Sequence, residues 1–159
     1  MRKIWIIPLI ILVVIVATVV VFDRGKTIHS IEKCKETKFP CIYAVVGKEK
    51  VKVINGTSTF DQEDGTTIMM GDVFPDDIDN MLDTLKVKKK DLVTLDFLNQ
   101  KPNHITVFQL KDYERLDKVD IDLNTYTFTA PTTSGTFMYE IYGEYENAVV
   151  HHYLKIKVR

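Results

Sequence analysis

Histidine is among the commonest metal ligands in proteins, and the chain has four of them: His29, His104, His151 and His152. Because neighbouring residues of a regular strand point to opposite faces, His151 and His152 cannot bind one metal ion from the same strand. A zinc or copper site would need a second strand that brings His104 beside His152. A metal-binding or hydrolytic domain built on His104 and His152 is therefore the alternative interpretation, whereas we expect no metal and no cofactor.

The chain's two cysteines, Cys34 and Cys41, are separated by six residues. In an oxidising compartment an even number of cysteines is typical of disulfide pairing, and this spacing would close a small loop. Two unlinked thiols, one of them buried, are the other interpretation. The sequence does not decide between the two.

No motif in the sequence points to catalysis. The chain has no Gly-x-Ser-x-Gly, no glycine-rich phosphate loop and no His-Glu-x-x-His. Its formal net charge of −1 at pH 7 lacks the excess of lysine and arginine that is typical of nucleic-acid binding. We therefore expect a protein that is not an enzyme and that binds no nucleic acid.

The longest apolar stretch of the chain runs from Ile4 to Phe22 and holds nineteen residues without a charge. As a helix it would extend roughly 28 Å, close to the hydrocarbon thickness of a bilayer. Pro8 lies near its start, where a missing N–H costs least. No small-x-small cleavage site closes the run. This pattern favours an uncleaved transmembrane signal anchor at residues 1–22 over a cleaved secretory signal.

The charges that flank this stretch give conflicting signals about its orientation. Arg2 and Lys3 precede it, as in anchors whose following domain is exported, but more lysine and arginine residues follow it between Arg24 and Lys38. The short, positively charged amino-terminal tail favours an amino terminus inside the cell. We expect a single-pass protein of the cell membrane whose carboxyl-terminal domain is extracytoplasmic.

Residues 23–39 are polar and are interpreted as a juxtamembrane linker, and residues 40–159 as one extracytoplasmic domain. Short β-branched and aromatic runs separated by turn residues predict roughly nine strands in this domain. Asn55-Gly56 predicts a tight turn between two of them. Pro75 to Lys86 breaks the pattern with apolar residues at helical spacing. The fold class is therefore mainly β, an antiparallel sandwich with one short crossover helix.

The last two predicted strands show the clearest alternation of apolar and polar residues. In the final strand, every second residue from Val150 to Val158 shares one face with the neighbouring strand's apolar residues. We expect a core that includes Phe128, Phe137, Tyr139, Ile141, Leu154, Ile156 and Val158.

The opposite face of this hairpin and a basic turn are the expected contact surfaces. Aromatic residues are enriched at protein interfaces, and a basic run can hold anionic groups, although a solvated turn is the simpler interpretation of the lysines. The candidate partner-binding residues are Tyr142, Tyr145, His151, Tyr153, Lys88, Lys89 and Lys90.

The segment Ser134-Gly135-Thr136-Phe137-Met138-Tyr139 resembles the Gly-x-Tyr-x-Cys entry to the penultimate strand of immunoglobulin-like domains. Phe137 stands at the position of the corner tyrosine, and Tyr139 at that of the core cysteine. The resemblance implies an immunoglobulin-like or fibronectin-like sandwich without the immunoglobulin disulfide.

A wider similarity covers most of Pro40 to Val158, including Tyr43-Ala44-Val45-Val46, Leu92 to Phe97, Phe128-Thr129-Ala130-Pro131 and Tyr145 to Val158. In these segments the chain is similar to small, uncharacterised secreted or membrane-anchored proteins of Bacillus-type bacteria. The similarity implies a Gram-positive envelope protein and carries over no catalytic residue. We expect a non-enzymatic module, held at the membrane by its anchor, that binds an unknown envelope protein or wall polymer.

The mature protein is expected to begin at Met1 and to retain residues 1–22, because no cleavage site follows the apolar stretch. Amino-terminal sequencing of protein isolated from membranes measures this, and a sequence that begins after Ala17 would show a cleaved signal instead. Protease treatment of intact protoplasts tests the orientation. A domain that is protected there would contradict an extracytoplasmic location.

Overall fold

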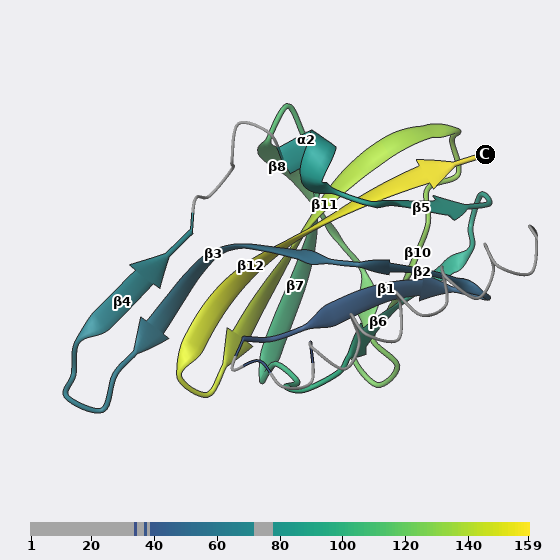
Figure 1. Ribbon diagram of the computed structural model, residues 1–159. Coiled ribbons are helices and arrows are strands. Elements are labelled where there is room, and N and C mark those ends of the chain that lie inside the picture. The colour runs from purple at the N-terminus through teal and green to yellow at the C-terminus, as the bar shows by residue number, and fades with distance from the viewer. Residues whose placement is uncertain (1–33, 35–36, 38, 72–77) are drawn as a thin grey trace, which may run out of the picture. The chain divides into compact units, whose positions relative to one another are not determined.

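The computed structural model describes residues 34, 37, 39–71 and 78–159 (Figure 1). The anchor expected at residues 1–22, most of the expected linker and the start of the expected helix at Pro75 lie outside the described residues. The chain divides into two compact units, Met1–Thr37 and Lys38–Arg159, and the second holds all the described strands. In the described ranges, no helix has the length and apolar character that crossing a membrane requires.

Five strands form one antiparallel sheet in the order β2-β1-β6-β10-β9. Ala44 of β1 lies opposite Leu95 of β6, and Phe128 of β10 lies opposite Val93 of β6. The strands of this sheet are β1 (Ile42–Val46), β2 (Glu49–Lys52), β6 (Leu92–Phe97), β9 (Ile121–Asp122) and β10 (Thr127–Thr129).

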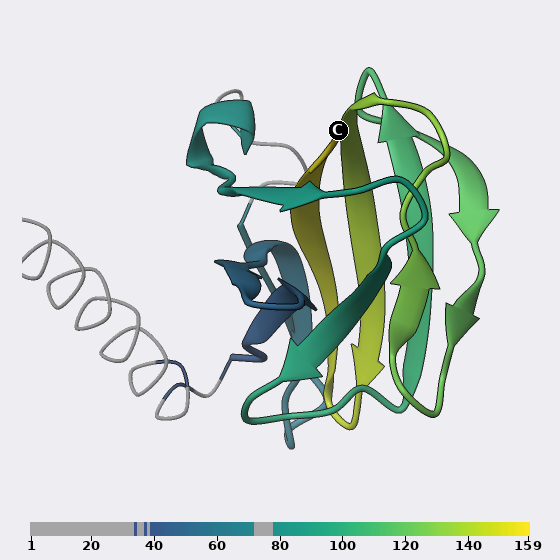
Figure 2. The same cartoon turned by 90° about the vertical axis from the view of Figure 1, so that its right-hand side faces the viewer.

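Seven strands form the second sheet, in the order β4-β3-β12-β11-β7-β8, with β5 also beside β12. Every pair in it is antiparallel except β5 with β12, which is parallel. Figure 2 shows the long strands β11 (yellow-green) and β12 (yellow) side by side. The strands of this sheet are β3 (Ile54–Asp61), β4 (Thr67–Met70), β5 (Thr84–Val87), β7 (His104–Lys111), β8 (Glu114–Val119), β11 (Gly135–Tyr145) and β12 (Ala148–Val158).

The predicted mainly β fold with two antiparallel sheets is confirmed, and the described part of the chain contains almost no helix. Its last hairpin follows the alternation in the sequence, since Ile141 lies opposite His152 and Tyr139 opposite Leu154. The predicted core is also confirmed. Phe137 packs against it partly buried, and the other members are buried in one cluster: Phe128, Tyr139, Ile141, Leu154, Ile156 and Val158.

The chain passes from one sheet to the other at Val53. Gly47 and Lys48 form the two-residue turn between β1 and β2, and Gly47 has a φ of 58°, which glycine adopts without steric cost. Val53 is buried and donates its N–H to Ile42 O at 3.0 Å. Ile54 then begins β3 in the other sheet. A single residue between β2 and β3 therefore joins the two layers of the sandwich.

One edge of β12 is shared by two strands. Its first part pairs with β3, and Lys155–Val158 pairs with β5. The predicted helix from Pro75 to Lys86 is therefore wrong in its last part, because α2 covers only Ile78–Met81 and is followed by β5. Leu85 and Val87 alternate into the core, and the open edge of β12 supplies backbone partners that a helix would leave unused.

A second, smaller apolar cluster lies on the other face of the seven-stranded sheet. Tyr153 is fully buried there, although its position on β12 points away from the main core. It packs against Ile78 of α2, together with Leu82 and Leu110. The helix thus covers part of the face that the sequence analysis assigned to a contact surface.

Asn55-Gly56 lies inside β3 and does not form the predicted tight turn. The pairing of β3 with β12 shifts here, so that Gly56 and Thr57 together lie opposite His151 in a β-bulge. A Cβ atom at Gly56 would overlap the ring of Tyr153. The glycine is therefore required by close packing against a neighbouring strand, and the dipeptide pattern alone could not show this.

Replacement of Tyr139 by alanine is expected to lower the free energy of unfolding by about 3 kcal/mol or more, because it removes a large aromatic side chain from the core. Lys157→Ala on β12 is the control, since Lys157 is exposed and should change stability by less than about 0.5 kcal/mol. Denaturant unfolding of both variants measures the difference. Equal losses would contradict the assignment of the two faces.

Candidate functional site

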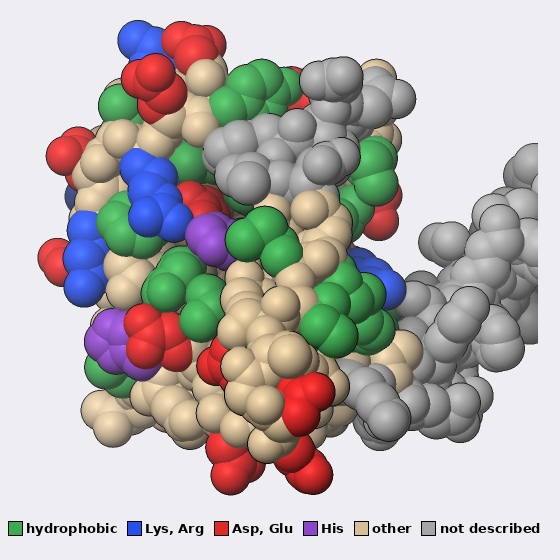
Figure 3. All heavy atoms as spheres, turned by 90° about the vertical axis from the view of Figure 1, so that its left-hand side faces the viewer, with side chains coloured by type: hydrophobic (Ala, Val, Ile, Leu, Met, Phe, Trp, Pro, Cys, Tyr) green, Lys and Arg blue, Asp and Glu red, His purple; other side chains and the backbone are tan. Residues whose placement is uncertain are grey.

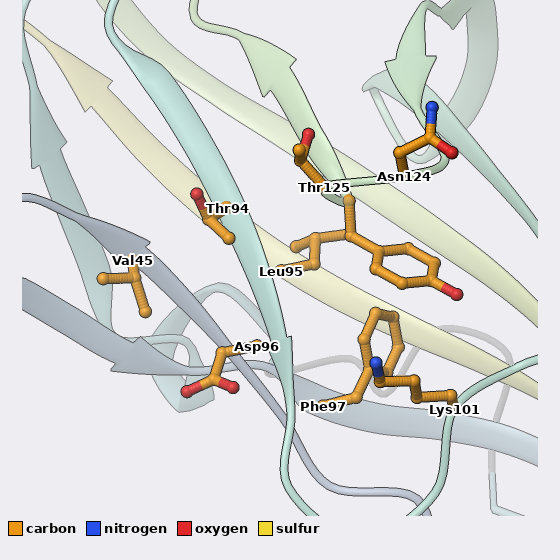
Figure 4. Close-up of a pocket in the computed structure, with 9 residues that line it drawn as sticks. Val45, Thr94, Leu95, Asp96, Phe97, Lys101, Asn124 and Thr125 are labelled. Atoms are coloured by element: carbon orange, nitrogen blue, oxygen red, sulfur yellow. The ribbon is translucent and has the colours of Figure 1, made fainter.

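A pocket of about 420 Å³ opens beside the end of β6 (Figure 4). Val45 of β1 and Thr94 of β6, which lie opposite each other, belong to its wall. Figure 4 shows Phe97 and Lys101 on one side of the pocket and Asn124 with Thr125 on the other. The remaining lining residues are Leu95, Asp96 and Tyr126.

An aromatic pair forms the apolar part of the pocket. The rings of Phe97 and Tyr126 meet edge to face, with centroids 4.9 Å apart. Tyr126 has a φ of 52°, and its C=O accepts the N–H of Leu95 at 2.9 Å, which fixes the ring beside β6. Lys101 Nζ lies 5.8 Å from the Tyr126 ring centroid, so the aromatic wall carries a cation at its rim.

Asp122 positions the backbone of Asn124 and the hydroxyl of Thr125 in the loop before β10. Asp122 accepts the N–H of Asn124 at 2.8 Å and the hydroxyl of Thr125 at 2.9 Å. These hydrogen bonds lower the pKa of Asp122, the backbone N–H of Asn124 having the largest effect. On the opposite wall, Asp96 is paired with Lys50 at 2.8 Å. The pocket thus combines aromatic edges, a lysine, an amide and hydroxyls, a set suited to binding a polar ligand.

A charged network lies on the outer face of the seven-stranded sheet. The Glu140 carboxylate is only 2% exposed and accepts two hydrogen bonds from the Arg115 guanidinium, at 2.6 and 2.7 Å. His151 Nδ1 lies 2.5 Å from Glu140 Oε1, the oxygen that also accepts from Arg115 Nη2. Burial alone would raise the pKa of Glu140, but the hydrogen bonds and charges of Arg115 and His151 outweigh it and lower the pKa to about 2.

Aromatic rings pack against the charged groups of this network. The Arg115 guanidinium lies 4.5 Å from the centroid of Phe108 and 5.8 Å from that of Tyr142. Tyr142 also meets the His151 ring edge to face at 5.3 Å. Arg115, Glu140 and His151 satisfy one another's hydrogen-bonding groups. We therefore interpret the network as a structural link between β8, β11 and β12 and not as a reactive centre.

A second polar network surrounds His152, which is fully buried. Its Nδ1 lies 2.7 Å from Asn55 Oδ1, and its Nε2 lies 3.1 Å from the hydroxyl of Tyr145. Burial, with a smaller effect from the charge of His151, lowers the pKa of His152 to about 3. The ring is therefore neutral at pH 7, donating from Nδ1 to the amide oxygen and accepting the tyrosine proton at Nε2.

The structure does not bring His104 and His152 together. His104 is exposed at the start of β7 opposite Glu144, whereas His152 lies opposite Ile141 on the core face of the sheet. Both ring nitrogens of His152 already have partners. In residues 39–71 and 78–159, no group of three or more histidine, cysteine, aspartate or glutamate side chains could hold a metal ion. The two-histidine alternative has no geometric support.

Only part of the predicted contact surface is accessible. Tyr145 and Tyr153 are 9% and 0% exposed, so neither side chain lies on an accessible face in this structure. Tyr142 and His151 are half-buried and belong to the Glu140 network. The run Lys88, Lys89 and Lys90 is exposed in a turn, in which Lys88 N donates to Asp91 Oδ2 at 2.7 Å.

Both cysteines are disulfide-bonded in the structure, and neither is free. Cys34 accepts hydrogen bonds at its C=O from the N–H and the hydroxyl of Thr37, at 3.4 and 3.0 Å. Cys41 donates its N–H to Asn99 Oδ1 at 2.9 Å, and Asn99 Nδ2 donates to Phe39 O at 2.7 Å.

The pocket residues were not found from the sequence, because they come from loops far apart in the chain. Phe97, Lys101 and Tyr126 show no shared spacing, and only the fold places them together. The Arg115–Glu140 pair was also missed. An isolated glutamate within an aromatic strand, at Glu140, was the one signal that pointed to a buried charge in need of a partner.

Comparison with protein-family models, curated proteins and solved structures found no match to this chain.

The buried neutral His152 is expected to make stability depend on pH. The pKa of His152 in the folded protein, about 3, lies below the usual 6.5. The free energy that the buried neutral ring contributes to folding is therefore fully present above pH 6.5, and it is lost as pH falls toward 3. Between pH 6.5 and 4.5, unfolding free energy should fall more steeply in the wild type than in His152→Gln, by up to about 1.4 kcal/mol per pH unit. His104→Gln, at an exposed site, is the control. Parallel curves for wild type and His152→Gln would contradict this account.

Proposed function

We propose that this chain is a membrane-anchored, non-enzymatic binding module of the Gram-positive cell envelope. Its sandwich lies outside the cytoplasm and binds a wall polymer in the pocket between Phe97 and Asn124. The observation that carries the proposal is the convergence of an aromatic pair, a lysine and loop-held polar groups in one open pocket. Ligand sites combine apolar walls with a few placed polar groups in this way.

The order of the strands supports an immunoglobulin-like sandwich. In such folds one sheet has the order A-B-E-D and the other contains C, F and G. Here β1, β6, β10 and β9 follow the first order, and β7, β11 and β12 follow the second. Strands β2, β3 and β4 are then an insertion after the first strand.

The apolar stretch from Ile4 to Phe22 supports the location at a membrane. A tether of this kind keeps the sandwich close to the inner layers of the wall. Local concentration then compensates for a weak contact, so an open pocket with few polar groups is sufficient for stable association.

The chemistry of the pocket favours a polymer with hydroxyl or amide groups and negative charge. The negative charge of Asp96 in the pocket wall is offset by its ion pair with Lys50. The positive charge of Lys101 at the rim therefore remains to attract an anionic group. Thr94 offers a hydroxyl and Asn124 an amide, and the rings of Phe97 and Tyr126 offer flat apolar surfaces.

The full-length chain in detergent is expected to sediment with insoluble cell-wall material from a Gram-positive bacterium. Lys101→Ala combined with Asn124→Ala should weaken this binding about tenfold, a loss of roughly 1.4 kcal/mol, because it removes a charge and an amide from the pocket. Lys118→Ala on β8 is the charge-matched control. Wild-type protein that stays in solution would overturn the wall-polymer proposal. Equal binding by the double variant would show that the polymer binds elsewhere.

A further inference from the structure

Strand β4, Thr67–Met70, is the outermost strand of the seven-stranded sheet. Among the described residues its only strand partner is β3. Figure 1 shows the β3–β4 hairpin reaching away from the rest of the sandwich, at the lower left. One edge of β4 therefore presents backbone groups that no described strand uses.

The register identifies these backbone groups. Gln62 N donates to Thr66 O at 2.7 Å, so these opposite residues form a hydrogen-bonded pair. Such pairs alternate with non-hydrogen-bonded pairs along antiparallel strands. Thr67 and Met69, opposite Asp61 and Thr59, are therefore the residues whose N–H and C=O point away from β3.

The side chains of this edge are apolar and exposed. Ile68, Met69 and Met70 are 46%, 71% and 45% exposed, and no residue of β4 is charged. Phe39, itself partly exposed, packs edge to face on Phe60 of the neighbouring strand at 5.3 Å. Together these side chains make an apolar surface next to an open strand edge.

The other three terminal strands of the two sheets carry charged side chains. Strand β8 carries Glu114, Arg115, Asp117 and Lys118, β2 carries Glu49, Lys50 and Lys52, and the two-residue strand β9 carries Asp122. Charged side chains on edge strands discourage pairing with another chain. The uncharged edge of β4 departs from this rule within the same molecule.

The charge around this edge is strongly negative. The tip of the hairpin exposes Asp61, Glu63 and Asp64, and none of them forms an ion pair with a described lysine or arginine. Figure 3 shows acidic side chains gathered at the lower end of this side of the molecule. Residues 54–70, which form the β3–β4 hairpin, contain no lysine or arginine that could offset these three carboxylates.

We propose that β4 is a docking edge that accepts a basic, extended segment of a partner protein as an additional strand. Backbone hydrogen bonds to Thr67 and Met69 give affinity, as in other cases of strand addition. Ile68, Met69 and Met70 receive the segment's apolar residues, and the acidic tip selects lysine or arginine. Pairing with a second copy of this chain is disfavoured, because it would bring two acidic hairpins together.

The test uses the full-length chain in detergent and a short peptide that alternates valine with lysine. A peptide that alternates valine with glutamate is the charge control. Binding is followed by amide chemical shifts. The lysine peptide is expected to shift the amides of Thr67 and Met69 most, with an affinity that falls as salt is raised. The glutamate peptide should not bind.

Two variants separate the backbone from the charge contribution. Met69→Pro removes the central outward N–H without removing a hydrogen bond to β3, and should weaken binding about tenfold. Met69→Ala keeps that N–H and is its matched control. Glu63→Lys should also weaken binding about tenfold, and Glu114→Lys on the distant strand β8 should not change it.

Three results would overturn the proposal: equal binding of both peptides, largest shifts at strands other than β4, or unchanged binding in both Met69→Pro and Glu63→Lys. If Met69→Pro does not fold, Glu63→Lys alone decides. Dimers of the chain that cross-link through β4 would show a second copy as the occupant and would also overturn it. The wall-polymer pocket is tested by other residues and another ligand, so the two proposals fail independently.

Discussion

The pairing of β11 with β12 runs from Gly135 opposite Val158 to Tyr145 opposite Ala148 without a break in register. This ladder sets which side chains enter the core, since a slip of one residue would move Tyr139, Ile141 and Leu154 to the other face. It also supplies the edges on which β7, β3 and β5 assemble. The five-stranded sheet then packs against the core face of this ladder, contributing Ala44, Val93, Leu95 and Phe128.

Two buried polar networks make this register harder to change. Glu140 on β11 is satisfied by Arg115 from β8 and by His151 from β12, and His152 is satisfied by Asn55 from β3 and Tyr145 from β11. A shifted strand would leave a buried carboxylate or imidazole without its partners, which costs more than the loss of an apolar contact. The networks thus contribute to the choice of one pairing over others, as well as to stability.

The sequence was sufficient for features that depend on local alternation and insufficient for those that depend on distant partners. The faces of β11 and β12 and the limits of β6 follow from runs of apolar residues. The segment containing Leu85 suits a helix or a strand equally well, and the open edge of β12 decided between them. The burial of Tyr153 depends on α2, and the pocket depends on loops that meet only in the folded chain.

The position of Cys41, directly before β1, determines where a mechanical force would enter the domain. Cys41 is held to the loop after β6 by two hydrogen bonds, from Leu98 N to its C=O and from its N–H to Asn99. Phe97, in the pocket wall, lies opposite Ile42, the first residue of β1. A force applied to the chain just before Cys41 would therefore enter the domain at the Ile42–Phe97 end of the β1–β6 ladder. The first backbone bonds to be loaded would be those of Cys41 to the loop after β6, and the long β11–β12 ladder lies in the other sheet.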